Sequence, residues 1–175
     1  FFSDHGDYTG DYGLVEKNQN TFEDALVRVP LLVKPPVGDA VVPRTTDALV
    51  ELVDFSATVY DLLGLDPGYD SFGKSLLPIV RGETDEHRDA VFCEGGRRMG
   101  EHQAKEMGSK AETLPTGLYW PRVGLQQSDQ PMYHTKATMC RSKRLKYVAR
   151  FDEPDQLYDL EHDPQELRNV ADSPD

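Results

Sequence analysis

Short apolar runs divided by glycines and prolines predict strands and short helices rather than one long periodic element. The opening Phe1-Phe2-Ser3 has the pattern of the end of a buried strand. The apolar run over residues 31–34, with prolines on both sides, predicts a strand that re-enters the same sheet. Residues 48–53 are almost wholly apolar and predict a strand or an extended segment. Apolar residues then recur at helical spacing over residues 55–63, and Gly64 is the expected helix end because glycine readily adopts the left-handed conformation.

Capping patterns predict further helices. Thr21-Phe22-Glu23-Asp24 has the spacing of a capping box, and the helix that it begins is expected to end at Arg28-Val29-Pro30. Residues 76–80 predict a short helical turn. Asp163-Pro164-Gln165-Glu166 combines an N-cap acid, a proline at the first position and an acid at the third, which predicts a final helix.

The second half of the chain predicts strands around a long irregular segment. The expected strands cover residues 89–93, 135–140 and 145–150, and the last two form an antiparallel pair. Residues 94–134 combine glycines, prolines and charges with few periodic apolar positions, which predicts a surface excursion carrying His102, Trp120, Arg122 and His134. We therefore divide the chain into an α/β core over 1–93, the excursion over 94–134 and a small C-terminal subdomain over 135–175.

The charge balance excludes some partners. Thirty-one acidic against nineteen basic residues give a net charge of −12, which disfavours nucleic acids and anionic membrane surfaces. The longest apolar stretches are only a few residues, so the sequence predicts no membrane span. Cys93 and Cys140 lack the paired spacing of a zinc site, and they leave open one disulfide or two free thiols.

Candidate chemistry is concentrated in the first seventeen residues. Asp4 and His5 offer a hard oxygen and an imidazole nitrogen to one cation or one oxyanion, and Gly6 allows a sharp turn beside them. Lys17 supplies a flexible positive charge for an anionic group. The alternative is that Asp4 and His5 only cap a turn after a strand. Because the chain begins inside this cluster, we expect the rest of the site to precede Phe1.

Six segments, taken in their order and spacing, resemble the C-terminal half of the sulfatases. They are Ser3-Asp4-His5-Gly6, Gly10-Asp11-Tyr12-Gly13, Lys17, Arg28-Val29-Pro30-Leu31, Gly73-Lys74-Ser75-Leu76-Leu77-Pro78 and the tail from Leu157 to Pro164. Each motif alone is weakly specific, whereas the set is specific. The resemblance covers nearly the whole chain apart from the excursion.

The resemblance implies an α/β fold of the alkaline-phosphatase-like superfamily. This chain would hold part of a mixed sheet with helices, plus a small C-terminal subdomain of antiparallel strands and a helix. The implied activity is hydrolysis of sulfuric esters by a formylglycine nucleophile, made from the Cys or Ser of a C/S-x-P-x-R motif in the family's N-terminal half. Cys93 and Arg97 have the spacing of that motif but lack its central proline, so we do not expect Cys93 to be the nucleophile.

The resemblance also implies residue roles. Asp4 matches a metal-ligating carboxylate, and His5 matches a neighbouring metal or sulfate contact at the catalytic centre. Lys17 matches a catalytic lysine that binds a sulfate oxygen or the departing ester oxygen. Tyr12 stands where the family often has histidine; we expect it to bind substrate by a hydrogen bond, since a phenol with a pKa near ~10 is a poor acid at neutral pH.

The expected cofactor is a divalent metal, calcium first, with manganese or magnesium as alternatives. The expected partners are a sulfate-ester small molecule or a sulfated saccharide, and the missing N-terminal half of the enzyme, without which the chain should be inactive. Two alternatives stay open: a phosphodiester or phosphonate-ester hydrolase of the same superfamily, and a non-catalytic interaction domain derived from the fold. Periplasmic or secreted members are common in the family, but the sequence predicts no compartment.

Overall fold

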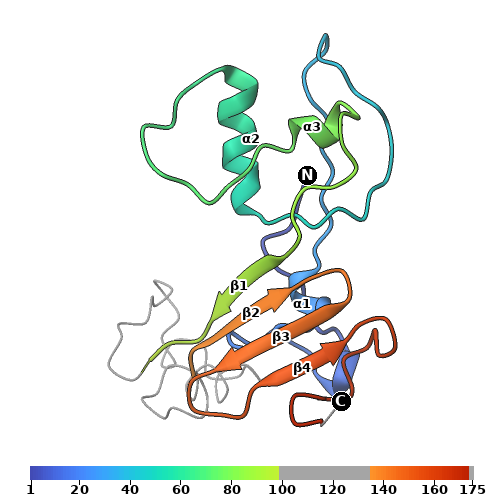
Figure 1. Ribbon diagram of the computed structural model, residues 1–175, viewed down its shortest axis with the longest axis vertical. Helices are drawn as coiled ribbons and strands as arrows, with labels where there is room; N and C mark the ends of the chain where they lie inside the picture. Colours follow the sequence, from blue (N-terminus) through green and yellow to red (C-terminus); the bar gives the residue numbers. More distant parts are fainter. Residues whose placement is uncertain (99–134, 174–175) are drawn as a thin grey trace, which may run out of the picture.

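Four antiparallel strands form the one sheet of the residues that the structure describes. The computed structural model of the protein describes residues 1–98 and 135–173. The strands are β1 (Val91–Gly95), β2 (Ala137–Arg141), β3 (Leu145–Arg150) and β4 (Gln156–Asp159), adjacent in space in the order of the sequence. Figure 1 shows this sheet at one end of the molecule and helices α2 (Val53–Leu63) and α3 (Leu77–Val80) at the other. Helices and an antiparallel sheet confirm the predicted α/β class.

The strand predictions for the second half hold, with small shifts in their bounds. β2 and β3 pair in the register Met139↔Val148, as the antiparallel prediction requires, and β1 joins the other edge of β2. The predicted excursion lies outside the described residues from position 99 onward, and so do His102, Trp120, Arg122 and His134. Among the described residues, no helix is long and apolar enough to span a bilayer.

One face of the sheet forms the core. Side chains alternate between the faces of a strand, so Ala137, Met139 and Val148 point to the same side. The buried Phe22 packs on them, just before the short helix α1 (Asp24–Val27). The N-terminal segment therefore covers the sheet that the C-terminal strands build.

The two cysteines lie on opposite faces of the sheet. Cys93 pairs with Met139 and shares its face, whereas Cys140 is the next residue along β2 and points the other way. Both are free thiols. Burial raises the pKa of the Cys93 thiol, and the charges of Glu51 and Glu94 raise it further. A thiol held protonated is a poor nucleophile, as expected for Cys93.

Two predicted helix starts differ from the structure. α1 begins at Asp24 without a side-chain cap, later than the capping box predicts, although it ends at Arg28 as expected. The Thr21 hydroxyl is instead 2.8 Å from the Tyr8 hydroxyl. The final helix predicted from Asp163 is wrong: residues 163–166 form turns, and Glu166 has φ 56°. A left-handed residue cannot continue an α-helix, and the side chain of Glu166 is drawn into the protein by Lys146.

The predicted pair of N-terminal strands is reduced to a single contact. Phe2 and Leu31 form one isolated antiparallel bridge, and the backbone amide of Leu32 donates to the carbonyl of Phe1. Phe1 is 79% exposed, so this segment is not buried by the described residues. Residues 48–50 belong to no strand or helix, so the strand predicted there is absent.

Helix α2 turns its polar side inward. It spans Val53–Leu63, so it begins two residues before the predicted start at Phe55, and it ends as predicted at Gly64, with φ 63°. Asp54 and Thr58 are its buried residues, whereas Phe55 is 48% and Leu63 61% exposed. These exposed apolar side chains on one helix indicate a surface that another element can cover.

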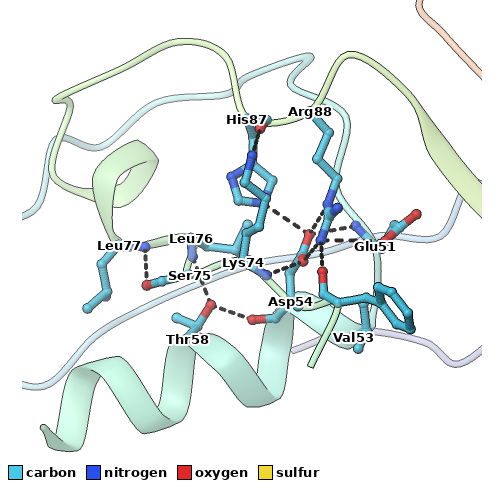
Figure 2. Close-up of polar contacts among 12 residues, drawn as sticks. Glu51, Val53, Asp54, Thr58, Lys74, Ser75, Leu76, Leu77, His87 and Arg88 are labelled. Carbon is cyan, nitrogen blue, oxygen red and sulfur yellow. Dashed lines mark hydrogen bonds and ion pairs between the residues drawn. The ribbon is translucent and has the colours of Figure 1, made fainter. Parts of the chain in front are cut away.

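Asp54 anchors the buried side of α2 (Figure 2). Its carboxylate accepts a two-pronged contact from Arg88, a hydrogen bond from His87 Nε2 at 3.0 Å, and the backbone amides of Glu51 and Lys74 at 2.9 and 2.8 Å. The network joins the start of α2 to the loop before α3 and to the segment that leads into β1. Burial by itself would raise the pKa of the Asp54 carboxyl, but the bonds from Arg88 and the two amides together lower it.

We expect Asp54→Asn to lower the free energy of unfolding by about 3–5 kcal/mol, because it removes the buried carboxylate that accepts from Arg88 and His87 and leaves Arg88 only its longer ion pair with Glu51 at 3.5 Å. Urea unfolding at neutral pH measures the change. Asp61→Asn is the matched control on the exposed side of the same helix and should change stability by less than about 0.5 kcal/mol. Equal losses in both variants would contradict the anchoring role.

The lowered pKa also predicts a pH dependence. A carboxyl whose pKa is lower in the folded than in the unfolded state stabilises the fold above its unfolded value near ~3.9, and this stabilisation is lost as the pH falls through the folded value. Unfolding curves between pH 6 and pH 2 should therefore converge for the parent protein and Asp54→Asn as the pH decreases. A constant difference would show that Asp54 is not the titrating group.

Candidate functional site

The Asp4–His5 pair is fixed by the glycine that follows it. The amide of Gly6 donates to the carbonyl of Leu26 at 2.7 Å, so the turn after the pair sits on α1. A Cβ on Gly6 would lie 1.9 Å from the carbonyl oxygen of Ala25. Only glycine lets the two backbones approach this closely. The pair is thus presented from a turn that is packed against a helix, rather than from a free chain end.

Asp4 and His5 direct their donor atoms toward one another. His5 Nδ1 lies 2.8 Å from the carbonyl oxygen of Gly6; because a carbonyl only accepts, Nδ1 carries a proton, and in the neutral ring Nε2 is the nitrogen with a free lone pair. Nε2 is 3.8 Å from Asp4 Oδ2, and the two side chains are 46% and 82% exposed. An oxygen and a nitrogen at this separation can ligate one divalent cation at bond lengths of about 2.0–2.6 Å.

The pair fits a metal, although it does not complete a coordination shell. Within residues 1–98 and 135–173, no third histidine, cysteine or carboxylate joins Asp4 and His5 in a cluster. The one such cluster in these ranges is Asp159, Glu161 and His162 on the surface, where Asp159 is ion-paired with Arg144. That group is a solvated, ion-paired turn.

Lys17 lies in the same cleft as the pair. Asp4, His5 and Lys17 all line a cleft of about 1920 Å³, to which Arg28 and Arg141 also contribute. The backbone amide of Lys17 donates to the side chain of Asp7, which ties the loop carrying the lysine to the segment after His5. The structure therefore brings three of the four predicted site residues to one cavity.

Tyr12 is the residue that the structure sets apart. Among the described residues that line the cleft, Tyr12 is absent. Its hydroxyl donates to the carbonyl of Gln165 at 2.9 Å. Burial, with the charges of Glu166 and Glu23, raises its pKa to about 12, so the phenol stays neutral and keeps its proton. The interaction joins the start of the chain to its C-terminal turn.

Two buried groups that support the site were missed by sequence reasoning. Tyr8 is 1% exposed, and its hydroxyl donates to Glu23 at 2.6 Å. Lys146 is fully buried and contacts Asp24 and Glu166. The sequence carries no signal for Lys146, because the apolar Leu145 and Tyr147 beside it on the strand lie on the exposed face while the lysine points inward.

The sequence is similar to known hydrolases over almost its whole length. Residues 10–119 match a family model described as N-sulphoglucosamine sulphohydrolase, C-terminal. The choline-sulfatase of Rhizobium meliloti (strain 1021) is 31% identical over 99% of this chain and 27% of its own length. The N-acetylglucosamine-6-sulfatase of Capra hircus is 27% identical over 100% of this chain and 31% of its own length.

The fold is shared with a solved hydrolase. The crystal structure of the phosphonate monoester hydrolase of Agrobacterium radiobacter has a TM-score of 0.70 and 28% identity, covering 99% of this chain and 31% of that protein. The chain spans less than a third of the length of each of these three relatives.

We expect Gly6→Ala to displace residues 4–6 from α1, because the added methyl group meets backbone that cannot move aside. The free energy of unfolding should fall by about 1–3 kcal/mol, and the Gly6 amide should exchange faster with solvent. Gly38→Ala is the control, since its Cβ would meet nothing within 4 Å and the only cost is its φ of 105°. Unchanged exchange at residue 6 in the variant would contradict the docking of the pair on α1.

Proposed function

Because this chain belongs to the N-sulphoglucosamine sulphohydrolase C-terminal family of sulfatases, within the alkaline-phosphatase-like superfamily, we propose that it is the C-terminal part of a sulfuric ester hydrolase. The observation that carries the proposal is the presence of Asp4, His5 and Lys17 in one cleft. A metal-ligating pair beside a lysine suits a tetrahedral oxyanion.

Asp4 and His5 would hold the divalent ion, for which calcium is the expected identity and manganese and magnesium are alternatives. When bound, the ion would polarise the sulfate oxygens and offset negative charge on them. The hydrogen bond from His5 Nδ1 to the Gly6 carbonyl would leave Nε2 of the neutral ring as the nitrogen that ligates the ion. Lys17 would bind a sulfate oxygen, or the ester oxygen as it departs, through its ammonium group.

The nucleophile would come from residues outside this chain. No C/S-x-P-x-R motif occurs in the sequence, so formylglycine is expected in an N-terminal part of the protein. The open apolar faces of Phe2 and Phe55, whose rings lie 5.1 Å apart, support a packing surface for such a part. On this proposal the chain alone turns over no sulfate ester.

Two different classes remain as alternatives. The first alternative is a phosphonate- or phosphodiester hydrolase, and the similarity to a phosphonate monoester hydrolase supports it. The same charged side chains can bind sulfuryl and phosphoryl oxygens. A non-catalytic interaction domain would keep the fold without the metal. For the substrate, the names of the relatives favour a sulfate ester of a small alcohol or of a saccharide.

Asp4→Ala, made in the protein that carries this chain, should weaken calcium or manganese binding and slow hydrolysis of an aryl sulfate by about 100-fold or more, because the ion loses a charged ligand. Calorimetry and initial rates measure the two effects. Asp11→Ala removes a nearby exposed acid and should leave both unchanged. A parent protein without a metal site, or with one indifferent to Asp4→Ala, would support the interaction domain; a parent that cleaves phosphonate esters in preference to sulfates would support the other hydrolase.

Tyr12→Phe separates a structural from a substrate-binding role for that residue. Because the hydroxyl is engaged with Gln165, we expect the variant to lose about 0.5–1 kcal/mol of unfolding free energy with KM unchanged. A several-fold rise in KM at unchanged stability would instead support the substrate contact predicted from the sequence. Urea unfolding and steady-state kinetics on the same samples decide between them.

A further inference from the structure

A fully buried lysine joins three distant segments of the chain. Lys146 Nζ donates to the carbonyl of Phe22 at 2.8 Å, to Asp24 Oδ1 at 2.7 Å and to both carboxylate oxygens of Glu166 at 2.8 Å. Its side chain is 0% exposed and that of Glu166 is 2% exposed. A buried ammonium group is tolerated only when it is surrounded by acceptors in this way.

The charges around Lys146 are balanced. Arg141 is its partner across β2 and β3, and the Arg141 guanidinium pairs with Asp24 Oδ2 at 3.0 Å. Two cations from paired strand positions therefore face two carboxylates, one from α1 and one from the C-terminal turn. Glu166 adopts φ 56° to reach this position. A non-glycine residue stays in the left-handed region only where its surroundings fix it there.

Helix α1 depends on this cluster for its position. It has only four residues and no side-chain cap, and a helix of that length has no stability of its own. Its first amide, Asp24 N, donates to Glu166 Oε1 at 2.9 Å, so the C-terminal turn supplies the missing cap. The other end of α1 receives the Gly6 amide on the Leu26 carbonyl. A continuous series of contacts thus runs from Lys146 through α1 to the turn that carries Asp4 and His5.

We propose that Lys146 and Glu166 are positioning residues for the Asp4–His5 pair: they fix the start of α1, and α1 fixes the turn at Gly6. The positional link from Lys146 through α1 to Gly6 rests on the hydrogen bonds of Lys146, Glu166 and Gly6. Its consequence for metal binding rests on the proposed function. Neither residue lines the cleft, and both act through the backbone of α1.

The test uses Lys146→Met, which keeps the length of the side chain and removes its charge. Lys136→Met is the matched control, since Lys136 directly precedes β2 and its ion pair is with the exposed Glu94. In the protein that carries this chain, hydrogen exchange of the Gly6 amide should rise at least about tenfold in Lys146→Met and stay unchanged in the control. The dissociation constant for calcium, titrated as calcium chloride and with manganese chloride in parallel, should rise by about tenfold or more.

Glu166 provides a conservative comparison. Glu166→Gln keeps an oxygen that can accept from the Asp24 amide, whereas Glu166→Leu does not. We expect Gly6 protection to survive in the first variant and to be lost in the second. If Lys146→Met does not fold, the double variant Lys146→Met/Glu166→Leu removes the buried pair together, a change that proteins often tolerate, and it should show the same loss of Gly6 protection.

The outcomes distinguish this inference from the proposed function. Folded variants with unchanged exchange at Gly6, and faster exchange only around residues 163–170, would overturn the inference. The cluster would then stabilise only the C-terminal turn. Faster exchange at Gly6 in a protein that binds neither calcium nor manganese would support the positional link and overturn the metal assignment. Faster exchange together with weaker metal binding would support both.

Discussion

The burial of Lys146 is the constraint on which the site end of the structure depends. An ammonium group shut away from water needs acceptors, and here they come from Phe22, Asp24 and Glu166. The C-terminal turn must therefore fold back onto the start of α1. The same requirement explains why Glu166 leaves helical geometry and why a segment with good capping residues forms turns. The buried charge of Lys146 thus holds the start of α1 and the C-terminal turn together.

At the other end of the molecule, a buried negative charge is surrounded by hydrogen-bond donors, as the buried positive charge of Lys146 is surrounded by acceptors. Asp54 is a buried carboxylate that collects donors from the segments before α2, before α3 and before β1. Figure 2 shows Asp54 and Thr58 of α2 within this network. The apolar Phe55, Val59 and Leu63 of the same helix are exposed. An outward apolar face of this kind is a surface that another segment or another protein can cover.

Sequence reasoning succeeded where the determining forces are local. The antiparallel pair of β2 and β3 and the stop of α2 at Gly64 depend on neighbours a few residues away, and both are confirmed. Asp4, His5 and Lys17 line one cleft, and their roles in a site stay a prediction. The final helix was wrong because a contact between Glu166 and Lys146, 20 residues apart, outweighs local capping. The contact between Lys146 and Asp24 spans 122 positions and has no local signature.

The residues of the candidate site bear on the choice between sulfate and phosphate esters. Asp4, His5 and Lys17 offer charge and donor atoms that suit any tetrahedral oxyanion, and nothing in the set distinguishes sulfur from phosphorus. Gly6 and α1 fix where the Asp4–His5 pair lies, and they do not affect which anion it prefers. A sulfate monoester carries one negative charge and a phosphate monoester up to two, so discrimination depends on the total charge around the anion. On the proposed function, the choice between the two hydrolases would therefore depend on the nucleophile and on further metal ligands, whereas Asp4, His5 and Lys17 would serve either reaction.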